Sequence, residues 1–149
     1  MAEYSAVAEQ TVAPGETIVF TGAPFPCNRG FVRHREDSGS FLLSGWTAQR
    51  CSKSAVYLVD FGANISVAEG GTVGPISVAL VLDGNTLPET IMTVTPAAVE
   101  EAFNVSRAAN VPVWRGCCQT VSVRNISDQP IVVSNANIIF NRPDLTVTY

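Results

Sequence analysis

The chain has 149 residues, of which 46% are hydrophobic and only 15% are charged, and its formal net charge at pH 7 is −4. This length fits one domain of ordinary size, and the apolar fraction excludes a wholly disordered chain. The negative balance argues against nucleic acid as a partner, because affinity for phosphates comes from clustered positive charge, and no apolar run approaches the roughly 20 residues that span a membrane.

The first part of the chain predicts short strands separated by turns. A Pro-Gly turn at residues 14–15 precedes a strand over residues 17–20. Residues 31–34 and 40–43 flank a turn at residues 36–39, and this arrangement predicts a hairpin.

The clearest strand covers residues 55–67. Its odd-numbered positions are all apolar, whereas Asp60 and Asn64 belong to the alternate set. Strict alternation of this length indicates one buried face and one more polar face. A further strand over residues 75–82 ends at an Asp-Gly pair that is typical of a tight turn.

One segment, residues 96–103, favours a helix. Thr95 suits the N-cap, Pro96 suits the first helical position, and Glu100 and Glu101 follow. We therefore expect a short helical connector there.

The last third of the chain predicts strands over residues 111–124 and 131–140. Roughly eight to ten short strands at this spacing indicate an all-β sandwich or barrel. The sequence contains neither a tandem repeat nor a linker, so we expect a single domain over residues 1–149.

No pattern in the sequence points to catalysis or to a cofactor. Motifs for a nucleophile elbow, a phosphate loop or a dinucleotide site are absent. The single histidine, His34, could formally pair with the thiol of Cys27 or Cys51. No motif supports that pairing, and the neighbouring Arg33 and Arg35 would disfavour a protonated imidazole. We expect no enzyme, no cofactor and no metal.

The four cysteines do not have the spacing of a metal site. Cys117 and Cys118 adjoin in an extended stretch, where successive side chains point to opposite faces, so they do not both reach one ion. Cys27 and Cys51 could bracket a hairpin and pair in an oxidising compartment. Reduced thiols inside a cell are the default expectation.

The start of the chain lacks the basic and apolar regions of a signal peptide. We therefore expect synthesis in the cytoplasm without export. Three Asn-X-Ser tripeptides, which begin at Asn64, Asn104 and Asn125, then match the glycosylation pattern by chance.

Trp114 is the best candidate for a contact between subunits. It has the parity opposite to Val113 and Val121, so it faces outward if these valines belong to the core. An exposed Trp is typical of a subunit interface.

Basic residues cluster in the predicted hairpin. Arg29, Arg33 and Arg35 either contact an acidic partner or form a solvated hairpin that pairs with Glu36 and Asp37. Both interpretations remain open.

Four segments carry a resemblance to a known family, namely residues 39–43, 55–65, 78–88 and 119–127. In this order they resemble the tumour necrosis factor-like and complement-type jelly rolls. The closest variant is that of spore-surface collagen-like glycoproteins and phage structural proteins. In addition, residues 24–31 and 113–119 look like small proteins of phages and prophages of gut Firmicutes.

The resemblance implies a two-sheet antiparallel jelly-roll sandwich that assembles as a homotrimer. It implies a non-enzymatic virion protein that decorates or cements a capsid, or that forms a head fibre. The alternative is a carbohydrate- or receptor-binding jelly roll on a virion or cell surface. An enzyme of the cupin type would need histidine metal ligands that a chain with one histidine lacks.

The resemblance also implies contact residues. The expected partners are other copies of the chain and the major capsid protein or another virion protein, with residues 1–13 as an N-terminal docking arm. Trimer contacts are expected at Trp114, Cys118, Leu58 and Asp60, and docking contacts at Tyr4, Arg29, Arg33 and Arg35.

Overall fold

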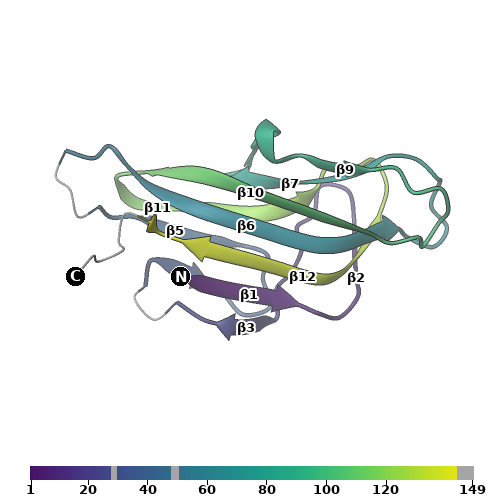
Figure 1. Cartoon of the computed structure of the whole chain (residues 1–149), viewed down its shortest axis with the longest axis horizontal. Helices are drawn as coiled ribbons and strands as arrows, with labels where there is room; N and C mark the ends of the chain where they lie inside the picture. Colours follow the sequence, from purple (N-terminus) through teal and green to yellow (C-terminus); the bar gives the residue numbers. More distant parts are fainter. Residues whose placement is uncertain (28–29, 48–50, 144–149) are drawn as a thin grey trace.

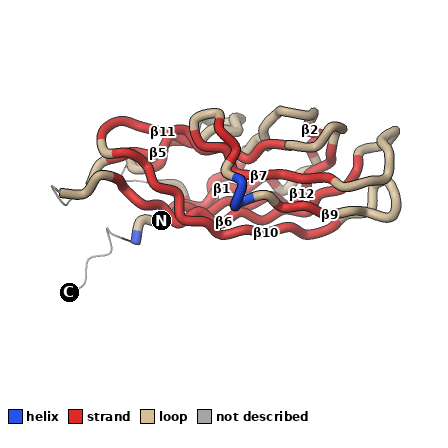
Figure 2. Tube along the Cα trace, turned by 90° about the horizontal axis from the view of Figure 1, so that it is seen from above, coloured by secondary structure: helices blue, strands red, loops and turns tan. Residues whose placement is uncertain are grey.

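The alternating apolar residues build two antiparallel sheets that pack face to face (Figure 1, Figure 2). The computed structural model describes the chain except for residues 28–29, 48–50 and 144–149 and the side chain of Cys117. The strands are β1 (Ala2–Ala6), β2 (Gln10–Val12), β3 (Gly22–Phe25), β4 (Val32–His34), β5 (Phe41–Gly45), β6 (Ser54–Val67), β7 (Ile76–Leu82), β8 (Asn85–Thr86), β9 (Met92–Val94), β10 (Phe103–Trp114), β11 (Gly116–Asn125) and β12 (Ile131–Asn141), and a short 3₁₀ helix, η1, covers Pro88–Thr90.

The first sheet, called sheet A, has the strand order β10-β6-β12-β1-β3, and β2 pairs with the start of β12. Its longest strand is β6, the strand predicted from residues 55–67, which pairs with β10 from Ser54–Trp114 to Ile65–Phe103. Figure 1 shows β6 between β10 and β12, with β1 and β3 beyond them.

The second sheet, sheet B, has the order β4-β5-β11-β7-β8, and β9 pairs with β7. The predicted hairpin is confirmed, because Val32 of β4 pairs with Leu43 of β5. The predicted turn after β7 is also confirmed. Asp83 and Gly84 both have positive φ (48° and 83°), as a two-residue hairpin turn requires.

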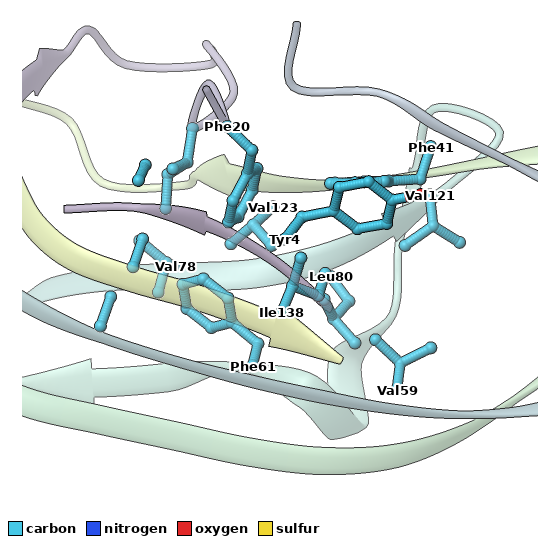
Figure 3. Packing of buried hydrophobic residues seen from close by; sticks show 14 of the residues in the cluster. Tyr4, Phe20, Phe41, Val59, Phe61, Val78, Leu80, Val121, Val123 and Ile138 are labelled. Carbon is cyan, nitrogen blue, oxygen red and sulfur yellow. The ribbon is translucent and has the colours of Figure 1, made fainter. Parts of the chain in front are cut away.

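The core lies between the two sheets and is largely aliphatic and aromatic (Figure 3). The ring of Phe41 contacts both layers, with its centroid 4.9 Å from that of Phe140 and 5.3 Å from that of Phe20. These contacts join β5 of sheet B to β12 of sheet A. The largest fully buried side chains are Tyr57, Phe20, Phe41, Phe61, Phe140, Ile18, Leu43, Ile65, Ile76, Leu80, Ile131 and Ile138.

The helix expected over residues 96–103 is absent, and the segment is a turn followed by the start of β10. The carboxylate of Glu101 accepts hydrogen bonds from the backbone N–H groups of Ala97 and Ala98, both at 3.1 Å. Glu100 has φ of 67°, and its N–H donates to the carbonyl of Val67. The glutamates therefore close a turn against the end of β6 and do not extend a helix.

The expected docking arm, residues 1–13, is part of sheet A instead of projecting from it. β1 pairs with β12 from Ala2–Phe140 to Ala6–Ala136, and its other edge pairs with β3. Ala2, Tyr4 and Ala6 point into the core. The segment joins the sheet because its small and aromatic residues alternate with Glu3 and Ser5, and this alternation gives it one apolar face that packs on the core.

Asn125 is fully buried at the end of β11. Its side-chain N–H groups donate to the carbonyls of Val12 and Gln129, both at 3.0 Å, and its side-chain oxygen accepts from the N–H of Ser127 at 2.9 Å. Hydrogen bonds of this buried amide therefore connect the end of β11 with β2 and with the β11–β12 turn.

None of the helices in the described part of the chain has the length and apolarity needed to cross a membrane.

A candidate assembly surface

Three of the four residues expected at a trimer contact lie on the outward face of sheet A. Leu58 and Asp60 alternate on β6 with the buried Tyr57, Val59 and Phe61, so both point away from the core. Trp114 ends β10 next to the buried Val113 and is 67% exposed.

One half of this face carries exposed apolar side chains. Val56, opposite Pro112, is 38% exposed, and Leu58 is 36% exposed. Further along, Ile139 of β12 lies opposite Asp60 on one side and Glu3 on the other. The exposed Phe25 of β3 lies opposite Glu3 at the far edge of the sheet.

The other half of the face is polar but uncharged. Asn104 donates to the side-chain oxygen of Asn64 at 3.1 Å, across the β10–β6 pair. Ser106 lies opposite Gly62 on the same pair of strands, and Ser134 lies opposite Asn64.

Charge is scarce on sheet A. Its strands contain two carboxylates, Glu3 and Asp60, and one cation, Arg107. Arg107 lies opposite the buried Phe61, so it has the parity of the inward-facing residues. β10 is an edge strand, and the guanidinium of Arg107 donates to the carbonyl of Ile91 at 3.2 Å. The outward face of the described strands is thus free of lysine and arginine.

The position of Trp114 depends on a close crossing between the two sheets. Its N–H donates to the side-chain oxygen of Gln119 at 3.0 Å. Gly116, with φ of 119°, then starts β11 opposite Gly45 of β5. A side chain at Gly45 would collide with the carbonyl oxygens of Trp114 and Gly116. Only glycine therefore allows the β10–β11 connection to approach β5 this closely.

Cys118, the fourth expected trimer contact, is not on this face. It belongs to β11 of sheet B, where it is half-buried and disulfide-bonded. Cys27 and Cys51 carry thiols and do not form the disulfide considered from the sequence. No group of three potential metal-binding side chains occurs among the described His, Cys, Asp and Glu residues.

The expected docking residues are divided between the core and the hairpin. Tyr4 is 5% exposed, and its ring centroid is 4.9 Å from that of Phe41. Burial raises the pKa of the Tyr4 phenol above its ordinary value. Tyr4 is therefore a core residue and not an exposed docking group, which corrects the expectation.

Arg33 and Arg35 are exposed on the β4–β5 hairpin, and Arg29 lies outside the described residues. An open cavity of about 850 Å³ adjoins this hairpin. His34, in its wall, stacks on Phe41 at 4.5 Å and contacts the carbonyl oxygen of Ser38 at 2.9 Å through Nε2. The cavity is lined by Arg33, His34, Arg35, Glu36, Asp37, Ser38, Ser40, Leu42 and Thr120.

Arg142, which was not among the residues predicted from the sequence, is 6% exposed at the end of the sandwich. Its guanidinium lies 4.9 Å from the ring centroid of Tyr57 and 5.4 Å from that of Phe31. The hydroxyl of Tyr57 donates to the carbonyl of Ser44 at 2.6 Å. No spacing in the sequence marks these residues, because they come from separate parts of the chain.

Comparison with protein families finds no matching model, and comparison with curated proteins finds no similar protein. Solved structures do match. The globular domain of zebrafish complement 1qA has a TM-score of 0.60 and 12% identity, and the match covers 93% of this chain and 94% of that chain. The Eiger TNF from S. frugiperda has a TM-score of 0.64 and 13% identity, with coverage of 99% and 97%. The expected tumour necrosis factor-like and complement-type jelly roll is confirmed as the fold.

Proposed function

We propose that this chain is a non-enzymatic structural module that assembles as a homotrimer through the outward face of sheet A and decorates a phage virion. The observation that carries the proposal is the exposure of the apolar side chains Trp114, Leu58 and Val56, which lie on neighbouring strands of this face. Centres of protein interfaces are enriched in aromatic residues and poor in charge. The jelly-roll fold and the resemblance of residues 24–31 and 113–119 to phage proteins support the same proposal.

The assembly is tested by light scattering on a size-exclusion peak. A trimer has three times 15.8 kDa, about 47 kDa. Leu58→Arg places a charge on the proposed contact and should give a folded monomer. Val73→Arg is the matched control, because Val73 is 49% exposed in the loop before β7, and it should remain trimeric. A wild-type monomer at micromolar concentration would contradict the proposal.

The virion assignment needs its own experiment. Particles purified on a density gradient should contain the chain in a copy number that is a multiple of three, as a trimer on a symmetric shell requires. Mass spectrometry of the particles measures this number. A chain that stays entirely in the unassembled fraction would contradict the virion assignment but not the trimer.

A second candidate function, carbohydrate binding, is favoured by the cavity of about 850 Å³ at the hairpin. Its lining combines the guanidinium of Arg33 with hydroxyl and carboxylate side chains such as Ser40 and Glu36, and saccharides bind through groups of this kind. A glycan array compares the wild type with Arg33→Ala. Signals lost in the variant would support this function, and an array without signals would contradict it.

A further inference from the structure

Glu3 and Asp60 occupy one row across the outward face of sheet A. Ile139 of β12 lies between them, opposite Asp60 of β6 and opposite Glu3 of β1. Ala108 continues the row on β10, and Phe25 continues it on β3. The two carboxylates therefore share one row with Ala108, Ile139 and Phe25, on the surface that the proposed trimer would cover.

The described neighbours of Asp60 are all uncharged. Those in its own row are Ala108 and Ile139, and the adjacent rows hold Ser106, Asn110, Asn137 and Asn141. Glu3 has Phe25 and Ile139 beside it and accepts a hydrogen bond from the side-chain amide of Asn137 at 2.6 Å.

The lysine and arginine side chains on or beside the described strands β6 and β10 are directed elsewhere or lie at a distance. Arg107 has the inward parity and donates to the carbonyl of Ile91. Lys53 precedes β6 by one residue, seven positions from Asp60, and this separation is about 23 Å along an extended strand. Arg115 follows Trp114 at the same end of the sheet, where its N–H donates to the carbonyl of Lys53.

Covering this face with a second copy removes water from both carboxylates. Loss of water penalises the ionised form of a carboxyl group far more than the neutral form. No lysine or arginine side chain on the same face of the described strands offsets that penalty. We infer that trimer assembly through sheet A is coupled to proton uptake by Glu3 and Asp60, so that mildly acidic conditions tighten the trimer. This inference rests on the proposed function.

The experiment is sedimentation equilibrium of the full chain at pH 7.5, 6.5 and 5.5. The dissociation constant of the wild-type trimer should fall by at least about tenfold over this range, because assembly that takes up protons becomes more favourable as pH decreases. The double variant Glu3→Gln/Asp60→Asn removes both charges and keeps the acceptor for Asn137. It should be tightly trimeric at pH 7.5 and nearly independent of pH.

The matched control is Glu69→Gln/Glu89→Gln, which changes the net charge equally at two exposed positions outside sheet A. It should follow the wild type. Circular dichroism of each variant verifies that it is folded.

The outcomes separate the two proposals. A wild-type trimer with the same dissociation constant at all three pH values would overturn the proton coupling and leave the trimer intact. A weaker trimer in Glu3→Gln/Asp60→Asn would also overturn it, because the carboxylates would then pair with cations of the neighbouring copy. Monomers at every pH, in the wild type and the double variant alike, would overturn the proposed trimer itself.

Discussion

The carboxylate of Asp83 accepts two hydrogen bonds from Thr120, one from its backbone N–H at 2.8 Å and one from its hydroxyl at 3.1 Å. The other carboxylate oxygen accepts from the side-chain amide of Gln119 at 2.9 Å. Gln119 in turn accepts from the N–H of Trp114. One turn residue of sheet B is thus connected to the side of the sandwich that presents Trp114.

Asp83→Asn should destabilise the fold at pH 7. The bond from Thr120 N–H holds the pKa of the Asp83 carboxyl below its ordinary value, with help from Gln119. We expect the free energy of unfolding to fall by about 1 kcal/mol. This is a small value for hydrogen bonds to a charged acceptor, because the site is exposed and water screens the charge. Urea denaturation measures the change, and Asp128→Asn, at an exposed turn position, is the control.

The loss of stability in Asp83→Asn should depend on pH. A depressed folded-state pKa stabilises the fold above the unfolded-state pKa, and this contribution is lost as the pH falls through the folded-state value. The difference between the wild type and Asp83→Asn should therefore shrink below about pH 4. A difference that persists at pH 2 would contradict the role of the charge.

Asn125→Ala should lower the free energy of unfolding by about 2–3 kcal/mol, because it leaves the carbonyls of Val12 and Gln129 without their buried donor. Asn85→Ala, at an exposed position of β8, is the control and should change stability by less than about 0.5 kcal/mol. Thermal unfolding followed by circular dichroism compares the two. Equal effects would contradict the structural role of the buried amide.

Gly45→Ala should destabilise the chain by about 2–3 kcal/mol, since the added carbon meets backbone atoms of Trp114 and Gly116 that have little freedom to move. Gly74→Ala is the control, because nothing lies within 4 Å of a side-chain carbon there. Chemical denaturation of both variants measures the change. A tolerated Gly45→Ala would mean that the β10–β11 connection is less tightly packed than described.

Tyr57→Phe should cost about 1–2 kcal/mol, because the ring stays in the core but the carbonyls of Ser44 and Phe31 lose a buried hydrogen-bond donor. Urea unfolding of the variant and the wild type in parallel measures this loss. An unchanged midpoint would show that water replaces the hydroxyl at the end of the sandwich.

The sequence predicted those features of the fold that follow from local patterns. Alternation over residues 55–67 predicted β6, and the parity of Val113 correctly predicted an outward Trp114. The Asp-Gly pair after β7 likewise predicted the turn at residues 83–84.

The errors arose where distant contacts override local preference. The glutamates at 100–101 suit a helix start, yet they close a turn against Val67. β1 has only five residues, and its place between β12 and β3 depends on pairing with β12 near the other end of the chain. The aromatic surroundings of Arg142 depend in the same way on residues far away in the sequence.

The pairing of Ala2 with Phe140 also has a consequence for synthesis. These residues are 140 − 2 = 138 positions apart in the chain. While the ribosome extends the polypeptide, β1 must wait for β12 to emerge, so sheet A is completed only once residues 131–141 have left the ribosome. Such non-local pairing slows folding, and until it is complete the apolar edges of β1 and β6 are open to mispairing with other nascent copies.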